Sequence, residues 1–148
     1  MIYEYVDWDS FIVKVRQLAH TIKNANYKPD IILGISRGGL IPATILSHIL
    51  KVKRLSSIQV EHYDDEGNEL NVKILSNSND FIQFDNILVV DDVADSGKTL
   101  KVVKDMLETK NVKLAVVYYK PWSNIVPDFY VRTTKNWIIF PWELEGRI

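Results

Sequence analysis

One stretch of the chain, residues 87–100, constrains the fold more than any other. It begins with four consecutive apolar residues, Ile87–Val90, and runs directly into two aspartates and a short polar loop. Such an apolar run is typical of a strand buried on both faces, as in a parallel sheet covered by helices. The apolar residues that follow, including Leu100, Val103 and Leu107, have helical spacing. The stretch therefore predicts a strand, a polar turn and a helix, and open α/β sheets bind ligands at such turns, outside the carboxyl ends of their strands.

The polar turn combines two kinds of chemistry. Residues Ser96–Thr99 stand at the expected start of the helix, where backbone N–H groups without helical partners form a phosphate site. Gly97 permits a close backbone approach or a positive φ. Asp91 and Asp92 would repel a phosphate, but their carboxylates suit sugar hydroxyls or a divalent cation. The turn therefore suits a ligand that carries both a phosphate and a ribose.

Two simpler interpretations explain less of this turn. Gly97-Lys98-Thr99 matches the end of a nucleotide-triphosphatase loop, but the first glycine of that pattern would fall at Asp92, so the glycine-rich wrap is missing. An ordinary helix cap explains Asp95 or Ser96. It does not explain three acidic residues within five positions.

A second turn of the same kind follows an earlier strand. Ile31–Ile35 is a short apolar run that leads into Ser36–Gly39, with Pro42 near the start of the next helix. The two glycines place backbone N–H groups at the turn, and the side chain of Arg37 suits phosphate oxygens. Taken alone, the segment also fits a tight turn with a solvated arginine. Because the 87–100 stretch offers a matching site, we interpret both turns as anion-binding.

The remaining patterns support an α/β architecture. An amphipathic helix is expected at residues 8–22, capped by Asp7 or Asp9. A C-terminal segment rich in aromatic residues, 126–143, reads as a closing strand interrupted by prolines. The other expected elements are helices at 41–50 and 99–110, a strand at 113–119, and strands at 55–63 and 70–75 that form a hairpin around the acidic loop Asp64–Asn68.

Composition excludes several classes of partner and chemistry. A chain of 148 residues suits one domain, residues 1–148. The formal net charge of -1 gives no electrostatic basis for binding nucleic acid or a membrane surface. The absence of cysteine excludes disulfides, thiol catalysis and thiolate zinc sites. Because we find no signal-peptide pattern and no apolar stretch long enough to span a bilayer, we expect a soluble cytoplasmic protein.

Residues 87–99 resemble a known family motif. An apolar strand followed by Asp-Asp-x-x-Asp-Ser-Gly-x-Thr resembles the 5-phosphoribosyl-1-pyrophosphate (PRPP) motif of type I phosphoribosyltransferases. The segment Ser36–Leu40 closely resembles the pyrophosphate loop of purine enzymes in that family. The family often has a non-proline cis peptide in this loop, which here would join Ser36 to Arg37.

The C-terminal part of the chain extends the resemblance. Lys120-Pro121 resembles the lysine that binds the 6-oxo group of a purine, and Trp137-Ile138 with Pro141-Trp142-Glu143 resembles the base-binding hood of xanthine–guanine-type enzymes. The resemblance therefore implies the type I phosphoribosyltransferase fold. In that α/β fold, a mainly parallel sheet is flanked by helices, with a flap hairpin and a small hood within residues 120–148.

The resemblance also implies a purine salvage reaction. A 6-oxopurine would react with PRPP to give a nucleoside 5'-monophosphate and pyrophosphate, with Mg²⁺ as cofactor. Asp92 would hold the metal, and Asp95 is the candidate catalytic residue for the proton at the purine N7. The implied binding residues are Asp91, Asp92, Ala94, Asp95, Ser96, Gly97, Lys98 and Thr99 for the ribose and 5'-phosphate, Ser36, Arg37, Gly38 and Gly39 for pyrophosphate, and Val93, Lys120, Trp137 and Ile138 for the base. Trp142 and Glu143 are expected to be structural.

The flap departs from the family pattern. Tyr63-Asp64 matches the family's Tyr-Asp, but the preceding residue, usually serine, is His62. Residues 61–72 contain no arginine, a residue that purine relatives of this size tend to carry, and Lys73 is the expected substitute. His62 and Tyr63 are therefore the candidate flap residues. A solvated acidic turn without a role is the alternative for this hairpin.

The residues leave other functions open. A non-catalytic regulator on the same fold could sense nucleotides or bind RNA, although the charge balance indicates no basic face. An enzyme for adenine or a pyrimidine is also open, but Lys120 would then lack its keto partner. The sequence does not rank hypoxanthine, guanine and xanthine. The family implies a homodimer or homotetramer.

Overall fold

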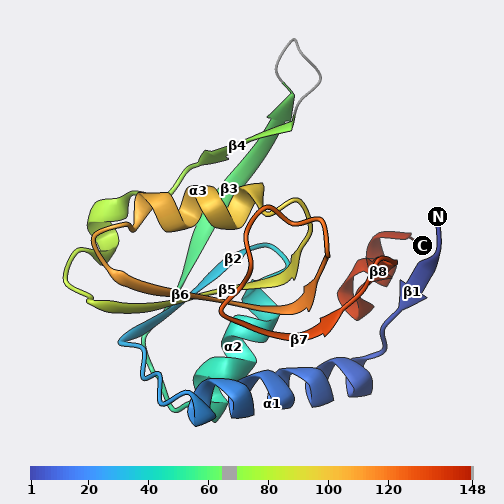
Figure 1. Ribbon diagram of the computed structural model, residues 1–148, viewed down its shortest axis with the longest axis horizontal. Coiled ribbons are helices and arrows are strands. Elements are labelled where there is room, and N and C mark those ends of the chain that lie inside the picture. The colour runs from blue at the N-terminus through green and yellow to red at the C-terminus, as the bar shows by residue number, and fades with distance from the viewer. Residues whose placement is uncertain (65–69, 148) are drawn as a thin grey trace.

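The protein, described here from a computed structural model, is built on a mainly parallel sheet with helices on both faces (Figure 1). The structure describes residues 1–64 and 70–147, so most of the acidic loop predicted at Asp64–Asn68 lies outside the described residues. Six strands are ordered β4-β3-β2-β5-β6-β7, and a separate two-stranded sheet pairs β1 with β8. The strands are β1 (Tyr3–Tyr5), β2 (Ile31–Ser36), β3 (Leu55–Asp64), β4 (Leu70–Ile74), β5 (Asn86–Ala94), β6 (Asn111–Tyr119), β7 (Phe129–Thr133) and β8 (Trp137–Ile139).

The central strand β5 lies between β2 and β6 and is parallel to both. Its side chains alternate between two hydrophobic clusters, because successive residues of a strand face opposite sides of the sheet. Leu88 and Val90 face the cluster that contains helices α1 (Trp8–Asn24) and α2 (Leu40–Ile49). Ile87 and Val89 face the cluster under helix α3 (Lys98–Met106). The predicted strand with two buried faces is confirmed, and so is the α/β fold class.

Helix α1 follows the predicted pattern with one difference. Asp7 caps its start by accepting a hydrogen bond from the Ser10 backbone N–H at 2.7 Å. The buried face consists of Phe11, Val15, Leu18, Ala19 and Ile22. Trp8, which the helical spacing placed on the apolar stripe, is half-exposed and contacts Trp142 with ring centroids 5.9 Å apart. It packs against the C-terminal segment because it stands one turn outside the sheet-covered part of the helix.

The predicted hairpin is also present. Strands β3 and β4 pair antiparallel, and they project from the body of the molecule at the top of Figure 1. A short 3-10 helix, η1 (Ser78–Phe81), leads back to the sheet. Helix α3 ends at Met106, four residues before the predicted end at Lys110, since Asn111 must already pair with Asn86 in the sheet.

The hood predicted within residues 120–148 also contains an N-terminal strand that the sequence patterns did not predict. Strand β1 pairs in parallel with β8, and the two termini lie near one another in Figure 1. A 3-10 helix, η2 (Pro141–Arg147), follows β8. Trp142 stacks on Phe140 with centroids 4.8 Å apart and contacts the ring edge of Phe11. We call β1, β8 and η2 together the hood. Among the described residues, no helix is long and apolar enough to cross a membrane.

Candidate active site

The two predicted anion-binding turns lie side by side. Strands β2 and β5 are neighbours in parallel register, with Gly34 opposite Val90, so their carboxyl ends reach the same edge of the sheet. The contact is close enough that a Cβ at Gly38 would collide with the carboxylate of Asp92. A Cβ at Gly39 would collide with the Val90 carbonyl and lie 2.7 Å from the Ile35 carbonyl. Backbone carbonyls of both strands therefore exclude a larger residue at 39, whereas a Cβ at 38 would displace the Asp92 side chain.

The turn after β2 has the expected backbone. A non-proline cis peptide bond joins Ser36 and Arg37, which confirms the expectation for this loop. The Gly39 backbone N–H donates to the Ile35 carbonyl at 2.9 Å, and helix α2 begins at the next residue. The side chain of Ser36 is half-buried between β2 and β3, with its hydroxyl 3.4 Å from the Ile58 carbonyl.

One cavity of 630 Å³ connects the turns. It is lined by Ser36 from the first turn, His62 from the hairpin, and a continuous run from β5 into α3. That run consists of Asp91, Asp92, Val93, Ala94, Asp95, Ser96, Gly97, Lys98 and Thr99. The structure thus brings together every residue that sequence analysis assigned to the ribose and 5'-phosphate.

The phosphate side of the cavity is the start of helix α3. Gly97 precedes the helix with φ 86°, in the left-handed region that favours glycine. The sequence left Asp95 or Ser96 as possible side-chain caps, but the N-cap is Gly97, and the Ser96 hydroxyl instead accepts from the Lys98 backbone N–H at 3.3 Å. Ser96, Gly97, Lys98 and Thr99 line the cavity at the start of this helix, where the first backbone N–H groups have no helical acceptors. This arrangement can bind an anion.

The two adjacent carboxylates are half-buried and influence each other. The Asp92 backbone N–H donates to Asp91 Oδ1 at 2.8 Å, and the Val93 backbone N–H donates to Asp92 Oδ1 at 2.8 Å. Burial raises the pKa of Asp91 well above its usual range, and the neighbouring Asp92 raises it further. Burial also raises the pKa of Asp92, and Glu143 contributes in the same direction. Two carboxylates whose charge is this poorly solvated suit a divalent cation.

The carboxylates do not form a complete metal site by themselves. Within residues 1–64 and 70–147, no three histidine or acidic side chains converge as metal ligands. Mg²⁺ commonly binds one or two carboxylates and takes its other ligands from water and substrate phosphates. The donor set at Asp91 and Asp92 therefore fits Mg²⁺ held jointly with a phosphorylated substrate.

A second cavity, of 860 Å³, lies beside the first and includes Arg37 and Gly38 of the predicted pyrophosphate loop, whereas Gly39 lines neither cavity. Arg37 and Gly38 line it together with Ser36 and Asp92, which also line the first cavity. The hood supplies its other wall through Trp142, Glu143 and Arg147. Trp142 and Glu143 were expected to be structural, and Arg147 had no expected role. A single arginine near the end of the chain matches no motif, so only the fold reveals that it faces Arg37 across a cavity.

The two candidate flap residues line different cavities. His62 lines both of the cavities described above, and its Nε2 lies 3.1 Å from the Thr99 hydroxyl. Tyr63 lines a smaller cavity of 330 Å³ with Lys98 and is half-exposed. Lys73, the expected substitute for the family's arginine, follows Val72, which faces the main cavity. Lys73 itself lines none of these cavities, so its role in the flap stays a prediction.

Lys120 lies beneath the cavity. Its side chain is buried, its backbone N–H donates to the Ala94 carbonyl at 3.0 Å, and its ammonium donates to the Asn136 carbonyl. Burial lowers the pKa of Lys120, whereas Asp95 opposes that shift. Asp95 accepts a hydrogen bond from the Trp122 indole N–H at 2.8 Å. Lys120 is thus adjacent to Ala94 and Asp95 but is not among the residues that line either cavity.

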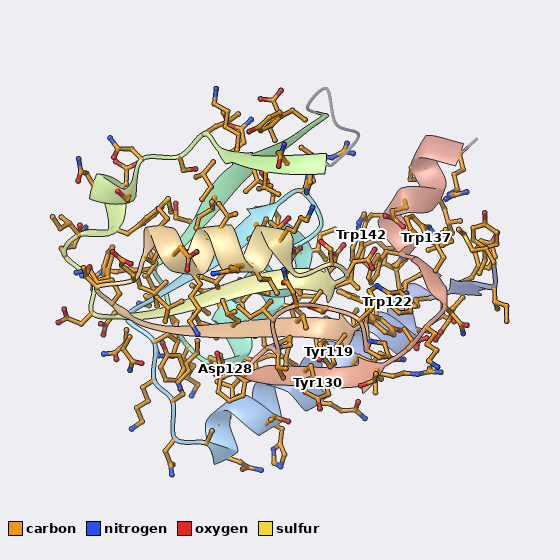
Figure 2. The ribbon with its side chains drawn as sticks, turned by 45° about the horizontal axis from the view of Figure 1, so that its top comes forward. Tyr119, Trp122, Asp128, Tyr130, Trp137 and Trp142 are labelled. Atoms are coloured by element: carbon orange, nitrogen blue, oxygen red, sulfur yellow. The ribbon has the colours of Figure 1, made fainter. Side chains whose placement is uncertain are left out.

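Trp137 and Ile138 belong to strand β8 of the hood. Trp137 is half-exposed and Ile138 is buried. Neither lines the two cavities. Figure 2 shows Trp122, Trp137 and Trp142 toward the same end of the molecule. Trp137 directly follows Asn136, whose carbonyl accepts from Lys120, so the predicted base-binding residues are linked through one short segment of chain.

Comparisons with known proteins agree with this geometry. Residues 1–146 match the family described as phosphoribosyl transferase domain. A purine phosphoribosyltransferase from Pyrococcus horikoshii is 38% identical, with a TM-score of 0.81, and the match covers 97% of this chain and 95% of that chain. A hypothetical protein from Neisseria gonorrhoeae with bound ppGpp is 26% identical, with a TM-score of 0.84 over 96% of this chain and 89% of that chain. Xanthine-guanine-hypoxanthine phosphoribosyltransferase from Helicobacter pylori, 23% identical, shares the fold with a TM-score of 0.82 over 98% of this chain and 96% of that chain.

Proposed function

The chain belongs to the phosphoribosyltransferase family of glycosyltransferase enzymes, and on that premise we propose that it transfers the 5-phosphoribosyl group of PRPP to a 6-oxopurine. The products are a nucleoside 5'-monophosphate and pyrophosphate. Hypoxanthine and guanine are the proposed acceptors, with xanthine a further one. The 38% identity to a purine phosphoribosyltransferase supports a purine as the acceptor.

One observation carries this proposal. Two turns that are far apart in the chain, 36–39 and 91–99, meet through the contact between Gly38 and Asp92 and line adjoining cavities. PRPP is a ribose with a phosphate at one end and a pyrophosphate at the other, so it needs two anion sites separated by groups that accept from sugar hydroxyls. Asp92 lines both cavities and Asp91 lines the first, so their carboxylates are available to supply those acceptors.

Different residues bind the two phosphorylated ends of PRPP. Backbone N–H groups of Ser96–Thr99 at the start of α3 bind the 5'-phosphate, with Ala94 and Asp95 shaping the turn. Ser36, Arg37, Gly38 and Gly39 bind the pyrophosphate, with a guanidinium that suits its oxygens. Arg147 faces the same cavity and adds a second cation near that group.

Asp92 is the proposed protein ligand for Mg²⁺, with Asp91 on the ribose hydroxyls. When bound, the ion neutralises charge on the departing pyrophosphate. Displacement at the anomeric carbon develops oxocarbenium character on the ribose. The two aspartates stabilise that developing positive charge through the ribose hydroxyls, and the anion sites hold both ends of the donor in line for attack.

The base is proposed to bind between the cavity and the hood. Val93 lines the cavity and offers an apolar contact to one face of the ring. Trp137 would stack on the other face, with the main chain at Ile138 meeting the C2 edge. The ammonium of Lys120 has three N–H donors and uses one for the Asn136 carbonyl, so it can also donate to a 6-oxo group. Asp95, held by Trp122, is the proposed acceptor of the purine N7 proton.

A second candidate is a nucleotide-sensing protein on the same fold. The similar Neisseria gonorrhoeae structure contains ppGpp, a guanine nucleotide with phosphates at two positions of its ribose. A pair of anion sites beside a purine pocket would suit such a ligand. Binding of ppGpp without any phosphoribosyl transfer is the outcome that would favour this candidate.

The test is a panel of acceptors with a single donor. The protein is incubated with PRPP and Mg²⁺ and, separately, hypoxanthine, guanine, xanthine, adenine or uracil, and nucleotide and pyrophosphate are quantified chromatographically. The proposal predicts product with oxopurines and none with adenine or uracil. Absence of nucleotide with every oxopurine contradicts it.

Light scattering of the same preparation tests the proposed homodimer or homotetramer.

A further inference from the structure

The N-terminal strand β1 carries a carboxylate to which the reaction described above assigns no role. The side chain of Glu4 is 18% exposed, and its Oε1 lies 2.9 Å from Arg132 Nη1. Its Oε2 accepts from the Thr134 hydroxyl at 3.4 Å and from the Asn136 side-chain amide at 3.3 Å. One carboxylate from the start of the chain thus contacts three residues near its end.

These contacts fix the segment around Asn136, whose carbonyl accepts a hydrogen bond from Lys120. Asn136 is fixed on both sides, because its backbone N–H donates to the Thr134 hydroxyl at 3.1 Å and its side-chain amide donates to Glu4. The carbonyl of this doubly bonded residue accepts a hydrogen bond from the Lys120 ammonium. The next residue, Trp137, donates its backbone N–H to the Ile2 carbonyl at 2.8 Å. The acceptor of the lysine is therefore placed by the N-terminal strand.

We infer that Glu4 is a positioning residue for Lys120. It orients the Lys120 ammonium toward the 6-oxo group of the purine, and its carboxylate favours the protonated form of that lysine. This inference rests on the proposed function, since it deepens the account of how the base is selected. Glu4 acts through Asn136 and through its own negative charge, and it does not touch the base. A variant at Glu4 should therefore affect use of the oxopurine more than use of PRPP.

The charges around Lys120 make the second part of the inference testable. Burial lowers its pKa, and Asp95 and Glu4 raise it. Arg132 faces the same region and is paired with Glu4. Tyr118 is also near, but burial raises the pKa of its hydroxyl to about 12, so it stays neutral in the assay range. Lys14, from α1, lies over the Tyr118 ring at 6.0 Å from its centroid. When the charge of Glu4 is removed, Asp95 is left as the carboxylate that raises the pKa of Lys120.

The experiment compares three variants of the full chain. Glu4→Gln keeps the size of the side chain and removes its charge. Arg132→Gln breaks the same ion pair but leaves the Glu4 carboxylate in place. Glu108→Gln makes the same chemical change at an exposed position and is the matched control. For each, KM for the oxopurine, KM for PRPP and the pH profile of kcat/KM for the oxopurine are measured.

Glu4→Gln should raise KM for the oxopurine about tenfold, because a hydrogen bond to a charged group is weakened. KM for PRPP should change less than about twofold. The alkaline limb of the pH profile should move to lower pH, since a lysine that loses a nearby carboxylate loses its proton more easily. Arg132→Gln should not move the limb to lower pH, and Glu108→Gln should match the parent.

Three results would overturn the inference. These are equal increases in both KM values, an alkaline limb that stays in place in Glu4→Gln, or the same shift in Arg132→Gln. A readout independent of catalysis is the pKa of Lys120, followed by NMR with ¹³C-labelled lysine and assigned with Lys120→Arg. If the parent transfers no phosphoribosyl group to any oxopurine, the proposed function fails. The inference about Glu4 is then overturned by an unshifted Lys120 signal in Glu4→Gln and supported by a signal that titrates at lower pH.

Discussion

Replacing Gly38 with alanine tests the close contact between the two turns. The added Cβ would lie 2.6 Å from the carboxyl carbon of Asp92, closer still to one carboxylate oxygen. Because carbon atoms in contact lie about 3.5–4.0 Å apart, the Asp92 carboxylate must retreat by about 1 Å. A displacement of about 1 Å in a positioned catalytic group can cost about 100-fold in rate. We therefore predict a loss of about 100-fold in kcat/KM for PRPP in Gly38→Ala.

The fold itself should tolerate this change. Gly38 does not have a positive φ, so alanine is compatible with its backbone conformation. Thermal unfolding should therefore stay within a few degrees of the parent, while steady-state rates at saturating Mg²⁺ fall. Glu108→Gln, at an exposed position outside both cavities, is the control. Parent-like kcat/KM in Gly38→Ala would refute the claim that the two turns form one site, and equal losses in both variants would refute the role of the Asp92 contact.

Three further substitutions test separate parts of the site. Asp92→Asn should lower kcat by about 10–1000-fold with little change in melting temperature, because it removes the proposed metal ligand near the carboxyl end of β5, outside the two hydrophobic clusters; unchanged turnover would remove the metal assignment. Lys120→Ala should raise KM for the oxopurine more than KM for PRPP, measured with each substrate varied in turn; equal effects would count against the base assignment. Gly97→Ala should destabilise the protein in thermal or denaturant unfolding by about 1–2 kcal/mol or more, because φ is 86° and a Cβ would lie 2.6 Å from the Ser123 hydroxyl; parent-like stability would contradict the left-handed turn.

The parts of the fold that follow from local patterns could be predicted from the sequence. The apolar run at Ile87–Val90 specifies a strand buried on both faces, and helical spacing then marks α3. The cis peptide after Ser36, in contrast, was expected only from the family resemblance. The patterns at residues 55–63 and 70–75 predicted the hairpin β3–β4 in the same local way as the strand and the helix. These features depend on residues that are close in sequence, so their signal is present in a short window.

The parts that were missed depend on long-range contacts. Strand β1 has three residues and forms only because β8, more than 130 positions later, pairs with it. No alternation of apolar and polar residues can be seen over so short a segment. The ion pair of Glu4 and the position of Arg147 in the second cavity arise only from this pairing and from η2. Lys120 was placed correctly at the carboxyl end of a strand, but its burial beside Asn136 rather than at the cavity surface also results from the hood.

The central claim is that PRPP spans the turns at 36–39 and 91–99. A crystal structure of the protein with PRPP and Mg²⁺, without an acceptor base, measures this directly. We predict the 5'-phosphate within hydrogen-bond distance of the backbone N–H groups at the start of α3, the pyrophosphate against Arg37 and Gly38, and the ribose hydroxyls facing Asp91 and Asp92. A donor bound with either phosphate end outside these turns would contradict the account.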